Sequence, residues 1–178
     1  MEYIIVNSNE KLYLRDQFIK NFINTEHEHY KKYIATLKEY PDGMCYDGYL
    51  WDVLNEPYDI TVRTQERAIE YLMEKDTVFV MWDIYSNKKV RLNDTIRLNN
   101  QKDTIISVNA KKLCETIEYE WNSGWNLENR YLPEDIYIFD DTMKWCVIFT
   151  HEGDDNYTNP ELDEDEYIRI CFVIDHTK

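Results

Sequence analysis

Glycine and proline are scarce in this chain, with four of each among 178 residues. A glycine-rich phosphate-binding loop is therefore excluded, and no Walker loop, G-x-G-x-x-G motif or G-x-S-x-G motif occurs in the sequence. So few chain breakers also argue against a disordered or loop-dominated protein. The composition instead predicts a chain that consists mostly of helices and strands.

Basic residues are outnumbered: 20 Lys and Arg stand against 35 Asp and Glu, which gives a formal net charge of −15. An electrostatic field of this sign repels phosphate groups, so we expect no binding to nucleic acid. The same charge keeps a protein in solution, and it speeds association with a basic partner. If the chain has a macromolecular partner, the charge favours a basic protein.

Long apolar runs and paired cysteines are also missing. No stretch approaches the roughly 20 apolar residues of a membrane span, and the N-terminal residues lack the basic and apolar regions of a signal peptide. None of the four cysteines, Cys45, Cys114, Cys146 and Cys171, forms a C-x-x-C pair. We therefore expect a cytoplasmic protein with buried free thiols and no membrane association.

Apolar residues make up 43% of the chain, which is ample material for the core of one domain. Helical spacing of apolar residues predicts helices over 10–23, 26–39 and 109–122. Another helix should begin after Thr64, a suitable N-cap, and bury Ala68, Ile69, Leu72 and Met73. The aromatic segment 44–54 is ambiguous, and either a short helix or an irregular segment would fit it.

Strand patterns occupy most of the remaining chain. Apolar runs or alternation predict strands over 2–6, 77–86, 104–108, 136–140, 145–150 and 167–175, with further short strands within 89–100. The last three should form a meander that begins with a β-hairpin. The order predicts an α+β fold in which N-terminal helices pack on a mainly antiparallel sheet ending in a three-strand meander. We expect one domain over 1–178, in which residues 1–43 could form a helical appendage to an α+β core of residues 44–178.

The triplet Thr150-His151-Glu152 follows the predicted strand 145–150. A histidine beside a carboxylate could act as a general base or bind a metal ion. Neighbouring side chains on an extended strand point to opposite faces, however, so His151 and Glu152 should diverge where the chain leaves the sheet. An H-E-x-x-H motif is absent, because Asp155 stands where the second histidine would be. We therefore assign no catalytic residue and no metal ligand here.

An acidic stretch follows this triplet and contains no Lys or Arg between Lys144 and Arg169. It partly matches a calcium-binding EF-hand loop that would begin at Asp154, but Asn159 and Asp165 replace the expected Gly and Glu. A solvated loop and a docking loop for a basic protein are the alternatives. No cofactor follows from the sequence.

Histidines and aromatic residues form three further groups. His27 and His29 lie two positions apart on a predicted helix, so their side chains cannot grip one ion from the same helix face. Aromatic residues mix with carboxylates around Trp51, with Tyr49 and Asp52, and again around Trp125. Such mixtures bind sugars or basic side chains, and they also occur at the edges of cores. The candidate binding residues are His151, Glu152, Asp154, Asp155, Asp163, Glu164, Asp165, Trp51 and Trp125.

The segment LPEDIYIFDDTMKWCVIFTHE, residues 132–152, resembles a strand-turn-strand that ends in W-x-x-x-x-T-H-E. This pattern recurs in small uncharacterised bacterial proteins, some of them in domain-of-unknown-function families and some similar to immunity proteins encoded beside secreted toxins. The resemblance implies a small bacterial cytoplasmic protein without established catalysis. It extends over Trp145, Thr150, His151 and Glu152, and not over the acidic stretch.

Taken together, the charge, the aromatic groups and the lack of a catalytic motif predict a non-enzymatic acidic protein-binding module. One form of it would be an immunity-type inhibitor of a basic toxin, because a nuclease surface is basic and an acidic protein can cover it. The alternative is a metal-assisted hydrolase that uses the His151 and Glu152 region. A stable domain with a regulatory role is the third hypothesis. The oligomeric state does not follow from the sequence.

Overall fold

The computed structural model describes residues 1–35, 49–55, 60–83, 90–91, 97–98, 104–122, 132–133, 135–154 and 168–177. Seven strands in this part of the chain form one sheet in the order β1–β6–β3–β7–β8–β9–β2, and every neighbouring pair is antiparallel. They are β1 (Tyr3–Ile5), β2 (Ile60–Thr64), β3 (Thr77–Trp82), β6 (Ile105–Asn109), β7 (Ile136–Phe139), β8 (Trp145–Asp154) and β9 (Ile168–Asp175). The predicted α+β class and the predicted C-terminal meander are confirmed. The short strands β4 (Val90–Arg91) and β5 (Arg97–Leu98) pair only with each other.

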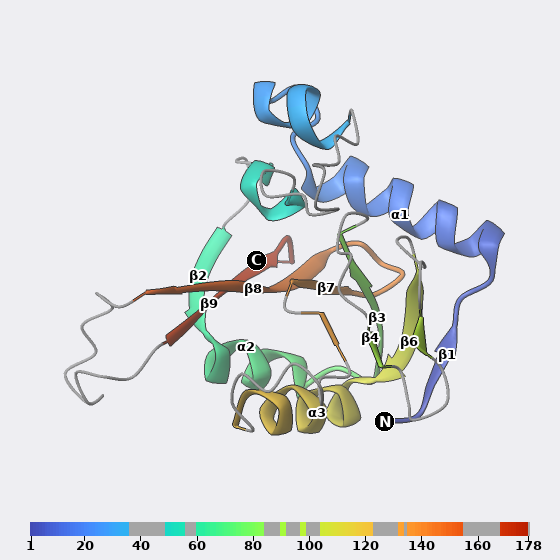
Figure 1. Ribbon diagram of the computed structural model, residues 1–178, viewed down its shortest axis with the longest axis vertical. Helices are drawn as coiled ribbons and strands as arrows, with labels where there is room; N and C mark the ends of the chain where they lie inside the picture. The colour runs from blue at the N-terminus through green and yellow to red at the C-terminus, as the bar shows by residue number, and fades with distance from the viewer. Residues whose placement is uncertain are drawn as a thin grey trace.

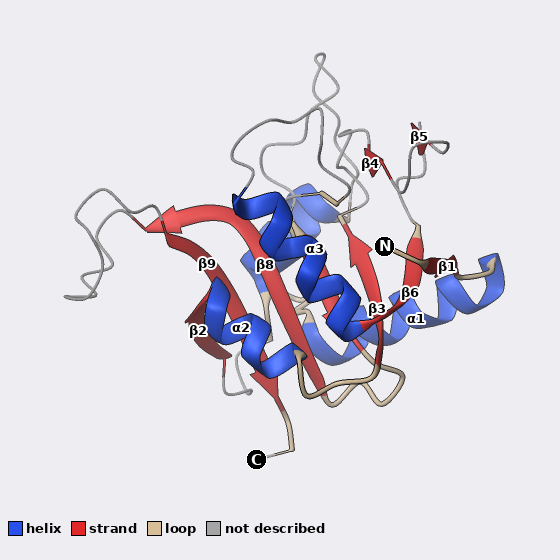
Figure 2. Ribbon diagram, turned by 90° about the horizontal axis from the view of Figure 1, so that it is seen from below, coloured by secondary structure: helices blue, strands red, loops and turns tan. Residues whose placement is uncertain are grey.

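Helices cover both faces of the sheet. Helix α1 (Ser8–Phe22) crosses one face, while α2 (Gln65–Leu72) and α3 (Ala110–Asn122) lie side by side on the other (Figures 1 and 2). Two short helical segments lie on the same side as α1: the π-helix η1 (Tyr30–Ile34) and the 3₁₀ helix η2 (Leu50–Val53). The molecule therefore has three layers, with the sheet in the middle.

The central strands divide their side chains between two cores. Trp145, Val147 and Phe149 of β8 pack toward α2 and α3, whereas Cys146 and Ile148 pack toward α1. This is the two-residue period of an extended chain. Because both faces are covered, the strands are apolar at nearly every position, which is why the sequence shows continuous apolar runs rather than simple alternation.

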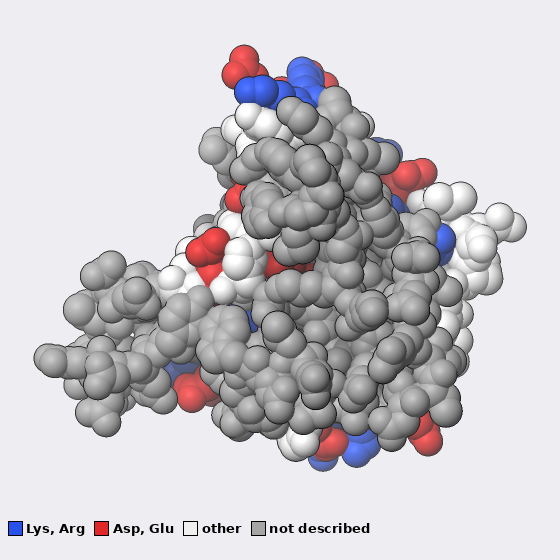
Figure 3. Space-filling view, in the orientation of Figure 1, with Lys and Arg blue, Asp and Glu red and all other residues white. Residues whose placement is uncertain are grey.

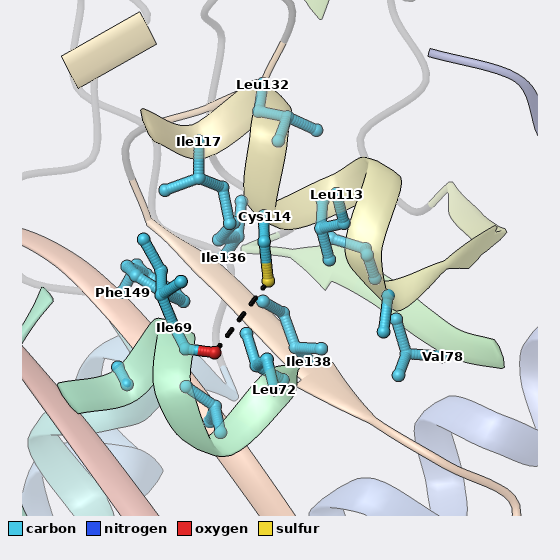
Figure 4. Close-up of a cluster of buried hydrophobic side chains, with 14 of the residues drawn as sticks. Ile69, Leu72, Val78, Leu113, Cys114, Ile117, Leu132, Ile136, Ile138 and Phe149 are labelled. Carbon is cyan, nitrogen blue, oxygen red and sulfur yellow. Dashed lines mark hydrogen bonds between the residues drawn. The ribbon is translucent and has the colours of Figure 1, made fainter. Parts of the chain in front are cut away.

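On the face of α2 and α3, the two helices meet over β7 and β8. Figure 4 shows Ile69 and Leu72 of α2 facing Leu113, Cys114 and Ile117 of α3, with Ile138 of β7 and Phe149 of β8 beneath them. The Cys114 thiol lies 4.0 Å from the carbonyl of Ile69. Three cysteines of the described chain, Cys114, Cys146 and Cys171, are buried free thiols, and burial raises the pKa of each of them.

On the opposite face, α1 is fixed at both ends. Asn7 is its N-cap, and the Asn7 side chain accepts a hydrogen bond from the backbone N–H of Glu10. Phe18 and Phe22 lie at the buried end, where the Phe18 ring contacts the rings of Tyr137 and Phe139 on β7. We predicted a possible helical appendage over 1–43. In the described part of that range, β1 pairs with β6 at one edge of the sheet and α1 covers one of its faces.

The helix predicted over 26–39 is confirmed in part: residues 28–34 are helical, the last five of them as the π-helix η1, and residues 36–39 lie outside the described chain. The predicted burial of Met73 needs correction. Met73 is 48% exposed because α2 ends at Leu72 and the chain turns there, as the bond from Lys75 N–H to the Leu72 carbonyl shows.

Among the described helices, none combines the length and apolar character needed to cross a bilayer.

Two leucines near the start of α1 test how much its buried face stabilises the fold. Leu14 is 3% exposed and Leu12 is 56% exposed. We expect Leu14→Ala to lower the free energy of unfolding by about 2–5 kcal/mol, because it leaves a cavity against the sheet. Leu12→Ala deletes the same atoms from an exposed position, so it should lower the free energy of unfolding by less than about 0.5 kcal/mol. Urea unfolding of both variants measures this, and equal losses would contradict the three-layer arrangement.

Candidate functional site

The triplet Thr150-His151-Glu152 lies inside strand β8 and not at its end. Pairing with β9 is regular up to Phe149, is interrupted, and resumes at Gly153 and Asp154. The interruption is a β-bulge, which adds residues to one strand and bends it. Figure 2 shows β8 bending along its length. The prediction that the chain leaves the sheet after Thr150 is therefore wrong.

The side chains of His151 and Glu152 converge, which corrects a second prediction. The His151 Nε2 atom lies 3.3 Å from the Glu152 Oε1 atom. Strict alternation along a strand would separate these groups, but alternation fails within a bulge because the backbone leaves the regular pleat. The His151 side chain is 30% exposed and that of Glu152 is 53% exposed, so both can be reached from solvent.

A buried carboxylate orients His151 from the other side. Asp135, just before β7, accepts a hydrogen bond from the His151 backbone N–H at 3.0 Å. Its two carboxylate oxygens also lie 2.9 and 3.1 Å from the His151 Nδ1 atom. The ring therefore carries a proton on Nδ1, because an ionised carboxylate can only accept. Nε2 is left as the nitrogen that faces Glu152.

The bulge is braced from within the sheet. Thr150 is fully buried, and its hydroxyl donates to the Ile170 carbonyl at 2.8 Å. The Nε atom of Arg169 donates to the Thr150 carbonyl at 2.6 Å, and its Nη1 atom donates to Gln65 Oε1 at 3.3 Å. A bulge leaves ladder groups without strand partners, and these side chains take their place. The position of His151 is thus fixed by the fold.

A second segment, residues 49–55, brings aromatic rings to His151. The Trp51 Nε1–H donates to Asp135 Oδ1 at 3.1 Å, the same oxygen that binds His151. The Tyr49 and Trp51 rings stack with centroids 5.4 Å apart and an angle of 19° between their planes. The His151 ring lies 4.9 Å from the Tyr49 ring and 6.0 Å from the Trp51 ring.

Asp52 completes the group, which we call the aromatic–acidic cluster: Tyr49, Trp51, Asp52, Asp135, His151 and Glu152. Burial raises the pKa of Asp52, and the Glu152 and Asp135 carboxylates add to this rise, while His29 and His151 oppose it. The Nε2 atom of His29 lies 3.6 Å from Asp52 Oδ2. In Figure 3, acidic side chains are visible on the surface between the helical turns at the top and the sheet below. Added positive charge would be stabilised here.

Two buried groups support the 49–55 segment from beneath. Asp83, which follows β3 and is 2% exposed, accepts hydrogen bonds from the Leu50 N–H at 3.1 Å and from the Tyr137 hydroxyl at 2.7 Å. The Tyr137 hydroxyl in turn accepts from the Trp51 backbone N–H at 3.2 Å. Burial raises the pKa of Asp83 to about 7 and holds that of Tyr137 well above its usual range.

The structure brings together three of the candidate residues chosen from the sequence: Trp51, His151 and Glu152. Asp154 is the last residue of β8, and the structure describes only its backbone. Asp155, Asp163, Glu164, Asp165 and Trp125 lie outside the described residues, so the calcium-loop and docking-loop hypotheses stay predictions. In the described part of the chain, no group of three or more His, Cys, Asp or Glu residues could hold a metal ion.

Sequence reasoning missed Asp135, Asp83 and Tyr137. Asp135 had a usable signal, because the predicted hairpin pairs Ile136 with Phe149 and so carries Asp135 to the level of residues 150 and 151. Asp83 and Tyr137 gave no such signal. Asp83 follows an apolar run and Tyr137 lies within one. The hydrogen bond between Asp83 and Leu50 spans 33 positions of the sequence, and the one between Tyr137 and Trp51 spans 86.

Comparison of the chain with protein-family models, with curated proteins and with solved structures finds no match. The candidate site therefore has to be interpreted from its own geometry.

The Asp83 carboxyl should make stability depend on pH in a specific direction. Its pKa is about 7 in the folded protein and lower in the unfolded chain, so the folded state holds a proton that the unfolded state has released. The contribution of Asp83 to the free energy of unfolding should therefore fall as pH rises from about 4 to about 7 and then level off. Asp83→Asn lacks this contribution, so between these pH values the wild type should lose up to about 4 kcal/mol more stability than the variant.

Urea unfolding of both proteins across this pH range measures the difference. The other carboxyl groups are common to the two proteins and cancel in the comparison. If the free energies of unfolding of the two proteins change in parallel with pH, the pKa of Asp83 is the same in the folded and unfolded chains and the prediction is wrong.

Proposed function

We propose that this chain is a non-enzymatic acidic protein-binding module, and that the aromatic–acidic cluster receives a basic side chain of its partner. The observation that supports this is the convergence of Tyr49, Trp51 and Asp52 with His151 and Glu152, from segments about 100 positions apart in the sequence. Aromatic faces attract cations, and flanking carboxylates add a direct charge pair. The site therefore suits an arginine or lysine side chain.

A similar cation–π arrangement occurs within the fold itself, around Lys75. The Lys75 Nζ atom lies 4.3 Å from the centre of the Tyr71 ring and 4.8 Å from that of the Trp145 ring. Asp175 accepts from the Tyr71 hydroxyl, and Asp140 accepts from the Trp145 Nε1–H. Two aromatic rings with attached carboxylates thus hold a cation at the α2 end of the sheet. The aromatic–acidic cluster presents the same types of group near the molecular surface.

The net charge of −15 supports a basic partner, because it would steer such a partner toward the surface from a distance. An immunity-type inhibitor of a basic toxin is the finer form of the proposal, and the W-x-x-x-x-T-H-E resemblance supports it. A cytoplasmic location is part of the same proposal, and the three buried free thiols are compatible with it. We propose no nucleic-acid partner, because phosphate would be repelled.

Replacement of cluster residues should weaken binding of a basic probe. With a labelled oligoarginine peptide, we expect Trp51→Ala to raise the dissociation constant about tenfold, because it removes the ring that stacks on Tyr49 and contacts His151 and so dismantles the aromatic part of the cluster. Glu152→Gln should raise it about threefold, and the effect should shrink as salt is added. Fluorescence anisotropy titrations at low and high salt measure both changes.

Glu74→Gln is the matched control for Glu152→Gln. Glu74 is exposed next to the end of α2, so the substitution changes the net charge equally but leaves the cluster intact. If both variants weaken the peptide to the same extent, the binding is due to net charge alone and the cluster is not the site. The finer proposal is tested by co-purification with the product of the adjacent reading frame, where Trp51→Ala should abolish a complex that Glu74→Gln retains.

A metal-assisted hydrolase remains the second candidate, and the observation that favours it is the 3.3 Å contact between His151 Nε2 and Glu152 Oε1. These two converging groups would supply part of the ligand set that a catalytic metal ion needs. Zinc, magnesium and calcium should then each be tested for a rise in the thermal midpoint, which binding to the folded state must produce. A rise that is lost in His151→Gln would support this candidate. No rise with any of the three ions would eliminate it in favour of the binding module.

A further inference from the structure

We propose that His151 is the internal counter-cation of the aromatic–acidic cluster, and that a basic side chain of the partner binds there in exchange for the proton on His151 Nε2. This inference deepens the proposed function and rests on it, because it concerns how that same site is regulated. Protons and the partner would compete for one group of carboxylates. Acid would therefore weaken the complex, and formation of the complex would release a proton to solvent.

Both ring nitrogens of His151 lie against carboxylate oxygens. Nδ1 is 2.9 and 3.1 Å from the two oxygens of Asp135, and Nε2 is 3.3 Å from Glu152 Oε1. A neutral imidazole has one N–H donor and one bare lone pair, so it can donate to only one of these carboxylates. Its bare nitrogen would then face a second acceptor. The imidazolium donates from both nitrogens and is stabilised by both negative charges, so the geometry favours the charged ring.

Ionisable groups from three neighbouring segments also surround this ring in the described chain. Tyr49 and Asp52 come from the 49–55 segment, and Asp52 interacts electrostatically with His151. His29 lies just before η1, with its Nε2 atom 3.6 Å from Asp52 Oδ2. Arg169 of β9 donates to the backbone next to His151 and stays charged at any pH at which proteins fold. The permanent cation among these neighbours is thus already bonded to the backbone, while carboxylates lie against the imidazole itself.

An arginine or lysine of the partner would use the same groups as the imidazolium. It would pair with Glu152 and lie on the rings of Tyr49 and Trp51, whose centres are 4.9 and 6.0 Å from that of the His151 ring. The incoming cation would therefore lie close to the imidazolium, where like charges repel. Loss of the Nε2 proton to solvent removes this repulsion and leaves Glu152 to the partner. The Nδ1–H stays on Asp135, so the ring need not move.

The effect of pH on binding has a definite direction. Between the titration midpoints of His151 in the complex and in the free protein, each binding event releases up to one proton. The affinity should therefore rise with pH by up to about tenfold per pH unit in this range and be constant above it. An ordinary carboxyl group titrates near pH 4 and a histidine near pH 6.5, so the two sources of pH dependence separate. Asp52 needs its own control, because burial raises its pKa.

Calorimetric titration of the full chain with oligoarginine measures the released protons directly. Titrations in two buffers of different ionisation enthalpy, repeated from about pH 5.5 to about pH 8, give the number of protons released per peptide bound. We expect up to one proton from the wild type and almost none from His151→Gln, whose affinity should also become independent of pH in this range. In Asp52→Asn the release should persist.

His29→Gln is the matched control for His151→Gln. The two histidine side chains are 29% and 30% exposed, and each imidazole lies beside a carboxylate of the cluster. Proton release should be retained in His29→Gln. Release that persists unchanged in His151→Gln, or that is lost only in His29→Gln, overturns the proposal, because another group would then exchange the proton.

A spectroscopic measurement on the wild type keeps the proposal testable if His151→Gln does not fold. The ring nitrogens of His151, assigned among the four histidines through their own side-chain carbons, report by NMR which nitrogen carries a proton. Saturation with oligoarginine should move the titration midpoint of this ring to lower pH by about one unit, which corresponds to a tenfold change in affinity. In the complex, the neutral ring should keep its proton on Nδ1. An unchanged midpoint, or a proton left on Nε2, overturns the exchange.

The two proposals fail in different ways. If oligoarginine binds and requires Trp51 but releases no proton at any pH, the exchange fails and the binding proposal stands. If oligoarginine does not bind the wild type even at about pH 8, where a histidine is neutral, the binding proposal fails and the exchange fails with it.

Discussion

Burial of the central strands on both faces is the constraint on which the rest of this structure depends. Strands β3, β7 and β8 have helices above and below them, so almost every side chain along them is apolar. Polar side chains in these strands are confined mainly to the strand ends and to the bulge. Asp83, Asp135 and Thr150 lie at those ends or at the bulge, and each is buried with hydrogen-bond partners. A buried polar group without partners would cost roughly 1–3 kcal/mol, so the partners are a requirement of the fold.

These satisfied carboxylates connect the core to the surface. Asp135 accepts from the His151 backbone and from the Trp51 indole, and it contacts the His151 ring. Asp83 and Tyr137 accept from the first two N–H groups of η2. A short 3₁₀ helix has little stability of its own. It is held in place because the ends of two buried strands supply the acceptors that its own chain lacks.

The aromatic–acidic cluster was only half accessible to sequence reasoning. Trp51, His151 and Glu152 could be chosen as polar or aromatic residues beside apolar runs, but nothing local indicated that they meet. The rule of alternation even gave the wrong answer for His151 and Glu152, because a bulge cannot be read from a pattern that assumes regular pairing. Asp135 could have been found from the hairpin register, since Phe139 pairs with Cys146 and the ladder extends back toward residues 135 and 150. Asp83 could not.

The sequence by itself determined the class of the fold, most of the strands, the N-cap at Thr64 and the meander at the C-terminus. These features depend on the period of apolar residues and on local capping, which a linear chain displays directly. Only the tertiary structure decided the strand order, the placement of α1 on the sheet, the bulge in β8 and the assembly of the cluster. Each of these features depends on contacts between residues that are far apart in sequence. Such contacts stabilise the chain only after folding has brought the two faces of the sheet and their covering helices together, so no local pattern in the sequence reveals them.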